Sequence, residues 1–377
     1  MSGQFFTKNK SLQEKVYEFI LNKPIEILEP SVGRGDLASY IQSQLPKIKF
    51  DMYEIDDKIN FLVDKKQIKF GDFLIQKITK VYRTIVGNPP YVRTKKGNLY
   101  IDFIKRCCDL LDNKGELIFI IPSDFFKLTC SANLLTNMLI QGTFTHIYHP
   151  HDEKLFEGAT IDIIVFRYCK DPLLEKKVLY NDKIMYINNN NGFITFSDKF
   201  LNNVKTIGDY FDVYVGFVTG RDDVFQHDTL GNINILWSKD KVKKFILIDK
   251  FPSPNKDIND HLLKHKDVLI NRKIRKFNDQ NFYEWGGLRN IEFVEKNQGK
   301  PCIYLRNMSR KKEVAFSGKI NYFGPGLFML YPKNNKVDID KIIKCLNSEE
   351  FQQDFIYADR FKIGNNQLFK STLPQEM

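Results

Sequence analysis

Over the first 170 residues, short apolar runs alternate with longer segments of helical periodicity. This alternation is typical of βα units that build a mostly parallel sheet. The predicted strands cover residues 26–28, 49–53, 68–70, 84–86, 117–121, 144–148 and 161–166, and the predicted helices cover 11–21, 36–44, 99–111 and 131–140. Their order predicts a doubly wound α/β domain, in which ligands bind beyond the carboxyl ends of the strands, near the point where the strand order reverses.

The remainder of the chain has a less regular pattern. Strand-like segments at 214–218, 234–237, 302–305 and 326–330 are followed by a helix-like run at 339–356. Candidate boundaries lie at 170–172 and in the polar stretch 188–192. We therefore expect a catalytic domain over residues 1–175 and a mixed α+β domain over residues 176–377.

The charge of the chain points to a polyanionic partner. Its 377 residues include 57 Lys and Arg against 46 Asp and Glu, a formal charge of +11. Strongly basic proteins usually bind polyanions. Basic clusters at 272–276 and 306–312 lie near aromatic residues such as Trp285. That pattern suits a nucleic-acid surface, although a solvated charged face explains the composition equally well.

Composition excludes several other classes. Hydrophobic residues make up 42% of the chain, so disorder is not its main state. The longest apolar run, 117–121, is far shorter than the roughly 20 residues that span a bilayer, and the N-terminus has no apolar signal segment. We expect no membrane partner, no secretion, and a cytoplasmic or DNA-associated protein. The six cysteines form no Cys-x-x-Cys pair, and His146, His149 and His151 complete no zinc pattern, so no metal is expected.

Three strand ends carry residues suited to a cofactor. The first strand runs into Glu29-Pro30-Ser31-Val32-Gly33-Arg34-Gly35-Asp36, whose glycines let the backbone approach a ligand. Glu54 follows the second strand, where an acid can bind a ribose diol. After the third strand, Asp72 can accept a hydrogen bond from an adenine amino group and Phe73 can cover its ring. Their order at βα spacing favours an adenosine-containing cofactor.

The most specific feature is Asn88-Pro89-Pro90-Tyr91, which follows the fourth predicted strand. Two successive prolines fix φ and donate no backbone hydrogen bonds, so the loop is stiff. Asn88 offers a carboxamide acceptor, Pro89 a backbone carbonyl and Tyr91 a flat aromatic face. These groups suit a planar substrate whose NH₂ nitrogen must become nucleophilic, because accepting both hydrogens draws that nitrogen towards tetrahedral geometry and frees its lone pair.

With these motifs in this order, the chain resembles the N6-adenine DNA methyltransferases of the γ class, and among them the branch typified by the Taq-type TCGA methylases. The resemblance implies a Rossmann-like methyltransferase domain with a C-terminal target-recognition domain. It implies S-adenosylmethionine as cofactor, held by Thr7, Glu29, Pro30, Ser31, Gly33, Glu54, Ile55, Asp72, Phe73, Asn88 and Phe125. Lys8 stands where the family usually has a proline after Thr7.

The same resemblance implies roles for further residues. Asn88, Pro89, Pro90 and Tyr91 match the catalytic loop, and Phe156, in Leu155-Phe156-Glu157-Gly158, matches the position of a second aromatic that stacks on the flipped adenine. A core position is an equally good explanation of Phe156. The segment 215–223 resembles the start of the recognition domain, where Arg221 could meet a phosphate or a guanine edge. Arg272 and Arg275 are further candidate DNA contacts from the basic cluster.

The expected function is site-specific transfer of a methyl group to N6 of adenine in double-stranded DNA. Such an enzyme would protect its site, TCGA by resemblance, from a cognate restriction endonuclease that shares the site and need not bind, and it would act as a monomer. Methylases of RNA bases or of glutamine side chains use the same loop, so they stay open as alternatives. A non-catalytic DNA-binding specificity protein on a methylase scaffold is a further alternative.

Overall fold

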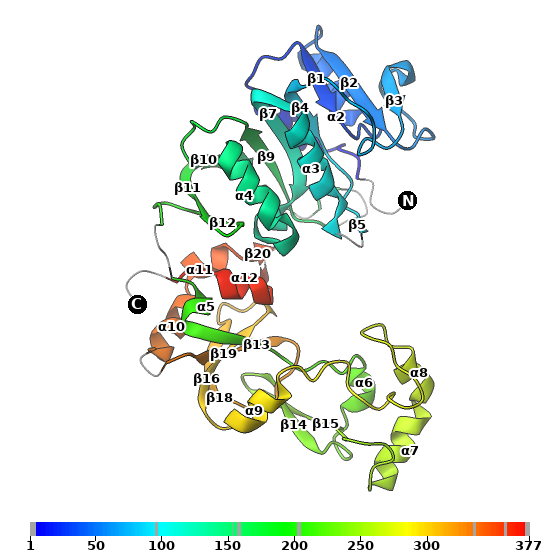
Figure 1. Cartoon of the computed structure of the whole chain (residues 1–377), viewed down its shortest axis with the longest axis vertical. Coiled ribbons are helices and arrows are strands. Elements are labelled where there is room, and N and C mark those ends of the chain that lie inside the picture. The colour runs from blue at the N-terminus through cyan, green and yellow to red at the C-terminus, as the bar shows by residue number, and fades with distance from the viewer. Residues whose placement is uncertain are drawn as a thin grey trace. The chain divides into compact units, whose positions relative to one another are not determined.

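A computed structural model describes residues 5–94, 97–152, 154–156, 160–201, 205–334, 337–357 and 360–373. The chain divides into two compact units, residues 1–203 and residues 204–377 (Figure 1). Among the described residues, no helix combines the length and the apolar character that crossing a bilayer requires.

The first unit is built on a large sheet. Its strands are β1 (Glu26–Glu29), β2 (Lys49–Glu54), β3 (Ile68–Phe70), β4 (Tyr82–Gly87), β7 (Leu111–Pro122), β8 (Thr143–Tyr148), β9 (Ile163–Cys169), β10 (Lys177–Tyr180), β11 (Lys183–Asn190) and β12 (Phe193–Ser197), and β5 (Arg93–Thr94) pairs separately with β6 (Gly97–Asn98). Its helices are α1 (Lys10–Glu18), α2 (Asp36–Gln44), α3 (Leu99–Leu110) and α4 (Ala132–Gln141), with the short turns η1 (Lys65–Gln67), η2 (Ser123–Lys127) and η3 (Thr129–Ser131).

The strand order confirms the doubly wound prediction. It runs β12-β11-β10-β8-β9-β7-β4-β1-β2-β3. The strands β3, β2, β1, β4 and β7 are parallel to one another, whereas β9 lies antiparallel between β7 and β8. The chain proceeds from β1 to one side through β2 and β3, and then returns to the other side with β4. The order therefore reverses between β1 and β4, where such sheets bind ligands.

Successive side chains of each strand point to opposite faces of the sheet. Ile27 belongs to a buried cluster with Leu12 of α1 and Ile41 of α2. Its neighbour Leu28 belongs to a second cluster, which includes Ile104 of α3. Figure 1 shows α3 and α4 across one face of the sheet. Because both faces are covered, the central strands are continuous apolar runs rather than alternating ones.

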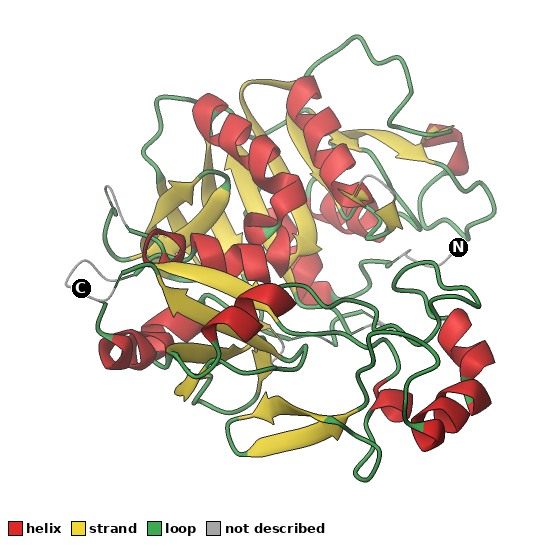
Figure 2. Cartoon of the chain, turned by 60° about the horizontal axis from the view of Figure 1, so that its bottom comes forward, coloured by secondary structure: helices red, strands yellow, loops and turns green. Residues whose placement is uncertain are grey.

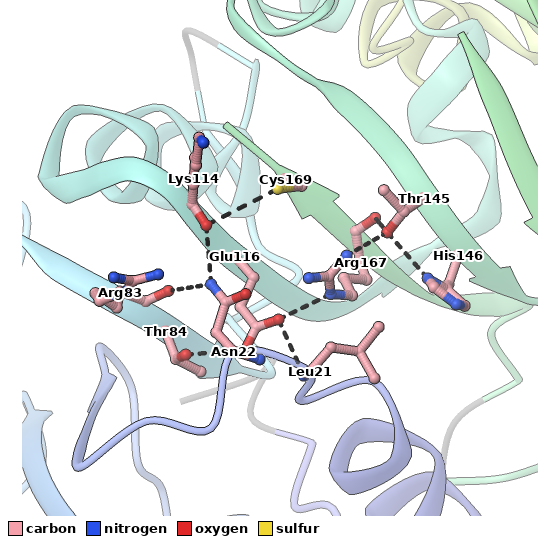
Figure 3. A network of polar contacts seen from close by, with 10 residues as sticks. All are labelled: Leu21, Asn22, Arg83, Thr84, Lys114, Glu116, Thr145, His146, Arg167 and Cys169. Atoms are coloured by element: carbon pink, nitrogen blue, oxygen red, sulfur yellow. Dashed lines mark hydrogen bonds and ion pairs between the residues drawn. The ribbon is translucent and has the colours of Figure 1, made fainter. Parts of the chain in front are cut away.

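A buried ion pair crosses the sheet at the ends of the strands opposite the carboxyl edge. Glu116 on β7 is fully buried, and its Oε2 accepts a hydrogen bond from Arg167 Nε on β9 at 2.8 Å. The same carboxylate accepts from Thr84 Oγ1 and from the backbone N–H groups of Leu21 and Asn22 (Figure 3). It thus ties the loop after α1 to three neighbouring strands, with every charged oxygen paired.

The unit boundary differs from the predicted one at 175/176. Strand β10 pairs parallel with β8, and β11 and β12 continue the sheet as an antiparallel hairpin. The polar stretch 188–192 is therefore not a linker, since residues 188–190 end β11 and only Asn191 and Gly192, both with positive φ, form the turn. Asn189 Oδ1 accepts from Gly192 N at 2.8 Å across this turn.

The second unit confirms the mixed α+β prediction, and much of it is loop (Figure 2). Its strands are β13 (Phe211–Val215), β14 (Ile233–Ser238), β15 (Lys241–Phe245), β16 (Pro301–Arg306), β17 (Met308–Ser309), β18 (Ala315–Lys319), β19 (Leu327–Pro332), β20 (Ile356–Tyr357) and β21 (Arg360–Lys362). Its helices are α5 (Ile207–Tyr210), α6 (Asp222–Phe225), α7 (Lys256–Lys264), α8 (Lys266–Ile270), α9 (Ile291–Asn297), α10 (Ile339–Leu346), α11 (Glu349–Gln353) and α12 (Asn365–Lys370).

An antiparallel sheet of order β13-β19-β16-β18 forms the centre of this unit, and β14 pairs with β15 as a separate hairpin. The helix-like run predicted at 339–356 is not one helix. It breaks after α10, where Asn347 turns to accept from Val314 N and Ala315 N. Ser348 then caps α11 by accepting from Phe351 N.

Removing Arg167 should destabilise the first unit strongly, because it leaves the buried Glu116 charge without its counterion. We expect Arg167→Met to lower the free energy of unfolding by about 3–5 kcal/mol. Lys183→Met is the matched control, since it removes a cation from an exposed pair with Asp198 and should change stability by less than about 1 kcal/mol. Denaturant unfolding measures both, and equal effects of the two variants would contradict a structural role for the buried pair.

Candidate active site

A cavity of about 530 Å³ lies over the carboxyl ends of the first unit's parallel strands. Residues after β1, β2, β3 and β4 contribute to it, together with the segment before α1 and part of α3. Its lining consists of Phe5, Phe6, Thr7, Glu29, Pro30, Ser31, Val32, Gly33, Asp36, Leu37, Glu54, Ile55, Gly71, Asp72, Phe73, Leu74, Asn88, Pro90, Val92, Leu99 and Phe103. This volume lies within the range of small-molecule and cofactor sites.

The turn between β1 and α2 needs its glycines. Gly35, the N-cap residue of α2, has φ +87°. A Cβ there would lie 2.8 Å from Val63 Cγ2, closer than van der Waals contact allows. Gly33 also has a positive φ, and its N–H donates to Glu54 Oε2 at 2.8 Å. The turn therefore brings backbone, rather than side chains, to the cavity wall.

Glu54 is held in place by backbone donors. Besides the bond from Gly33, its Oε1 accepts from Ile55 N at 2.9 Å and Asp56 N at 3.1 Å. A carboxylate offers about four lone-pair sites. One acceptor position is therefore left for a ligand hydroxyl beyond these three bonds, as the prediction of a ribose contact requires.

A group of acids gives the cavity a negative wall. Glu29 is buried, and its Oε2 has no hydrogen-bond partner among the described residues. Burial, reinforced by the nearby Asp36 and Glu54 carboxylates, raises the pKa of Glu29 well above its usual value of 4.5. Burial also raises the pKa of Asp36, against the opposing effect of Arg34. An unpaired buried carboxyl of this kind suits a ligand that brings a cationic or hydrogen-donating group.

Asp72 and Phe73 form another part of the wall. Asp72 Oδ1 accepts from Leu74 N at 2.9 Å, which fixes the turn after β3. The Phe73 ring is nearly fully buried and stacks on Phe103 with a centroid separation of 5.6 Å. Asp72 and Phe73 are consecutive in the chain, and both line the cavity. They offer a planar ligand ring a hydrogen-bond acceptor and a fixed aromatic face.

Asn88 lines the cavity, and its carboxamide makes three hydrogen bonds. Its Nδ2 donates to Phe5 O at 2.8 Å and to Thr7 Oγ1 at 3.1 Å. Its Oδ1 accepts from the Tyr91 hydroxyl, which also lies 3.0 Å from Ile120 O. Burial raises the pKa of Tyr91 well above its usual value, so this hydroxyl is a neutral donor. The acceptor that a substrate amine would use is therefore already paired within the loop.

Three aromatic rings meet beside this loop. Phe5 lies 5.4 Å from Tyr91 and 5.6 Å from Phe156 between ring centroids, and Tyr91 and Phe156 lie 6.2 Å apart, edge to face. The structure thus brings Phe156 from the loop before β9 to the predicted catalytic loop. Glu157 and Gly158, which belong to the same motif, lie outside the described residues.

Of the predicted cofactor residues, Phe125 is the one that does not line this cavity. Its ring is fully buried and stacks on Phe166, with an interplanar angle of 12°. Conversely, sequence reasoning missed Phe5, Phe6 and Asp36, which do line the cavity. Two signals could have found them: Phe5 and Phe6 directly precede Thr7, and Asp36 is the first residue of the helix after the glycine turn.

The three predicted DNA contacts of the second unit differ in their surroundings. Arg221 is partly exposed and pairs with Asp223, and Arg275 is partly exposed and donates to Glu284. Arg272 is buried, and its guanidinium donates to the carbonyls of Leu269, Thr219 and Phe282 while stacking on Phe277 at 3.7 Å. Arg272 therefore organises the surrounding loops instead of presenting its charge to a ligand.

The topology and the cavity together define a doubly wound α/β protein that binds its ligand where the strand order reverses. Residues 36–156 match the family described as Eco57I restriction-modification methylase. The predicted relationship to these enzymes is thereby confirmed at the level of the restriction-modification methylases.

Individual relatives agree with this assignment. Type II methyltransferase M.HindII of Haemophilus influenzae is 25% identical over an alignment that covers 92% of this chain and 83% of that protein. Type II methyltransferase M.HincII of Haemophilus influenzae is 29% identical over 45% of this chain, and Modification methylase CviBIII of Paramecium bursaria Chlorella virus NC1A is 36% identical over 32% of it. The last two alignments cover only 37% and 38% of those proteins.

A solved structure shares the fold of both units. It is that of the Type IIL restriction-modification enzyme MmeI in complex with DNA, with a TM-score of 0.62 and 10% identity. The superposition covers 97% of this chain and 64% of that chain. At this identity the likeness concerns the fold alone.

Replacing Glu29 should change how stability depends on pH. Because its pKa is raised in the folded protein, the stability it contributes is full below its usual value of 4.5 and is lost as the pH rises through the folded value. Glu29→Gln removes that loss, so we expect the variant to gain about 1–3 kcal/mol over the wild type near pH 8 and little near pH 5. Thermal unfolding across this range measures the difference.

Glu26→Gln is the matched control, because Glu26 lies at the exposed start of β1 and pairs with Lys80. It should leave the pH profile of stability as in the wild type. A Glu29→Gln profile parallel to that of the wild type would show that Glu29 is ionised in the folded protein.

Proposed function

We propose that this protein transfers the methyl group of S-adenosylmethionine to N6 of a flipped-out adenine in double-stranded DNA. The observation that carries the proposal is the hydrogen-bonded Asn88 loop at the end of the cavity, with Tyr91 and Phe156 beside it. The restriction-modification methylase family supports DNA as the substrate. By resemblance, the site would be TCGA and would be shared with a restriction endonuclease that need not bind the protein, which would act as a monomer in the cytoplasm.

The cavity residues fit the proposed cofactor, which supplies an activated methyl group when bound. Glu54 would accept from the ribose hydroxyls, since its carboxylate is fixed by three backbone donors. Asp72 and Phe73 would receive the adenine ring. The unpaired Glu29 Oε2 supports a cationic or hydrogen-donating group near the glycine turn, because such a partner would supply the missing hydrogen bond and favour the ionised carboxylate.

The Asn88 loop would prepare the substrate nitrogen. Accepting both amine hydrogens, through Asn88 Oδ1 and Pro89 O, draws the nitrogen towards tetrahedral geometry and frees its lone pair. Asn88 Oδ1 accepts from the Tyr91 hydroxyl in this structure, so the amine either uses the second lone pair of this oxygen or replaces that hydroxyl. Loss of this bond frees the Tyr91 ring to stack on the base. Holding donor and acceptor in line supplies most of the acceleration, since the transfer is a direct displacement.

Adenine in a duplex is out of reach, so the base must swing out at a cost of a few kcal/mol. Stacking on Tyr91 and Phe156 would recover roughly 1–3 kcal/mol per aromatic contact. In the structure these rings touch each other, at 6.2 Å between centroids. Two parallel rings with a base between them lie about 7 Å apart, twice the van der Waals separation of roughly 3.5 Å. The rings therefore have to part when the base enters.

Transfer to alternative acceptors decides between the candidate functions. The full chain is incubated with S-adenosylmethionine labelled in the methyl group and with duplex DNA, structured RNA or a glutamine-containing protein loop. Label in DNA supports the proposal, whereas label only in RNA or only in protein refutes it. No transfer, combined with tight DNA binding, would indicate the non-catalytic specificity protein. Sequencing of the modified positions then gives the target base and its site.

Asn88→Ala should nearly abolish methyl transfer while leaving cofactor affinity within several-fold. The variant removes the acceptor for the amine, and loss of one such polar group typically costs about 10²–10³ in kcat. Single-turnover transfer and equilibrium dialysis of the cofactor measure the two quantities. The control is Asn113→Ala, an exposed residue of β7 that does not line the cavity. Full activity of Asn88→Ala would refute the assigned role.

DNA affinity should fall steeply with salt. Residues 204–377 carry 29 Lys and Arg against 22 Asp and Glu, an excess that can neutralise phosphates. A protein that makes six to ten phosphate contacts loses roughly 10³–10⁵ in affinity between about 50 and 200 mM salt. Fluorescence anisotropy of a labelled duplex over this range measures the slope, and a flat profile would contradict binding led by phosphates.

A further inference from the structure

The loop between β8 and β9, which carries Phe156, has its two ends joined by a buried pair. His149 lies directly after β8 and Asp162 directly before β9. His149 Nε2 lies 2.9 Å from Asp162 Oδ1 and 3.0 Å from Oδ2. The side chains are only 7% and 8% exposed, so solvent screens the pair weakly.

Each end of the loop is also fixed to a neighbouring element. On the Asp162 side, Ser123 Oγ donates to Asp162 Oδ2, and Ser123 N donates to Asp162 O at 3.0 Å. On the other side, His149 N donates to Asn181 Oδ1 at 2.8 Å, and Asn181 Nδ2 donates to His149 O at 3.2 Å. The pair is thus anchored to the turn after β7 and to the turn between β10 and β11.

The imidazole of His149 has a partner on both nitrogens. A carboxylate can only accept, so the hydrogen on Nε2 is donated to Asp162. Nδ1 lies 2.9 Å from the Tyr180 hydroxyl. The His151 ring covers the imidazole with a centroid separation of 3.8 Å. Contacts on both edges and one face fix the orientation of this ring.

Neither His149 nor Asp162 lines the cofactor cavity, and the hydrogen bonds described for them do not involve the Asn88 loop. Any influence on the reaction must therefore act through the loop that they close. Within that loop, Phe156 is 4% exposed and touches Tyr91 and Phe5. Clamping both ends of the loop reduces the number of conformations that Phe156 can adopt. Less conformational entropy is therefore lost when its ring is held against a base.

We propose that the His149–Asp162 pair is a positioning clamp that sets the Phe156 ring for the target base. The inference rests on the proposed function, since it assigns the clamp an effect on base binding. His149 and Asp162 are positioning residues, not catalytic ones. Removing His149 or Asp162 should therefore weaken binding of the target base only in a protein that still contains Phe156.

A double-mutant cycle tests this dependence. The variants Phe156→Ala, His149→Ala and the double variant are compared with the wild type in kcat and KM for duplex DNA, and in fluorescence of 2-aminopurine placed at the mapped target position. Losing one aromatic platform corresponds to a fall of roughly 5- to 150-fold in base binding. We expect His149→Ala to show a similar but smaller fall, and the double variant to be no worse than Phe156→Ala.

Three controls separate positioning from loss of folding. Cofactor affinity should stay within about twofold of the wild type in every variant, because the cavity lining is untouched. His149→Gln should restore base binding in part, since its amide can donate to Asp162. His146→Ala removes the imidazole on β8 that bonds to Thr145, away from the loop, and should leave base binding unchanged.

The outcomes distinguish the clamp from the proposed function. The clamp would be overturned, with the DNA activity intact, if His149→Ala bound the target base as the wild type does. It would also be overturned if the losses of base binding in the two single variants multiplied in the double variant. A Phe156→Ala protein with unchanged base binding would overturn both the stacking role of Phe156 and the clamp. A fall in His149→Ala that is matched by equal loss of cofactor affinity would show a general structural effect and would also overturn it.

Discussion

The architecture of the site depends on the parallel pairing of β1 with β4, which meet through Leu28 and Ile85. These strands are distant in sequence, and β2 and β3 are built on the far side of β1 before β4 returns to it. Because parallel strands end at the same edge, the pairing brings Glu29 and Asn88 to one cavity. The acidic wall around Glu29 and the Asn88 loop proposed as catalytic are thereby neighbours, although neither could form the site alone.

At the opposite edge, the buried Glu116–Arg167 pair joins β7 to β9, and Glu116 also accepts from Thr84 on β4, the strand that precedes the Asn88 loop. The unit thus separates its tasks: the Glu116 carboxylate is paired on both oxygens and holds neighbouring strands together, whereas Glu29 at the cavity keeps an unpaired oxygen. A buried carboxyl without a partner is unfavourable in the free protein. That cost is offset when a ligand supplies the missing donor, so binding and stability are linked at this residue.

Much of this could be predicted because it follows from local pattern. The helix 36–44 and the strand 68–70 have the bounds expected from the sequence, and Glu54 and Asp72 could be placed because strand ends converge. The positions of other side chains depend on packing contacts that the sequence pattern does not display. Phe125 turns into the core against Phe166, and the basic cluster did not reveal that Arg272 donates to three carbonyls. The hairpin β11–β12 was hidden because its polar turn resembles a linker.

The paired state of Asn88 has a consequence for selectivity. One lone pair of its acceptor is occupied by a hydroxyl of the same loop, so an incoming group that needs this position competes with an intramolecular partner at high effective concentration. A water molecule or a lone alcohol offers one bond in exchange for the one it displaces. An amine that is held by both Asn88 and Pro89, and is buried between aromatic rings, offers more. In the proposed transfer, the loop would thus favour an amine over solvent before any chemistry begins.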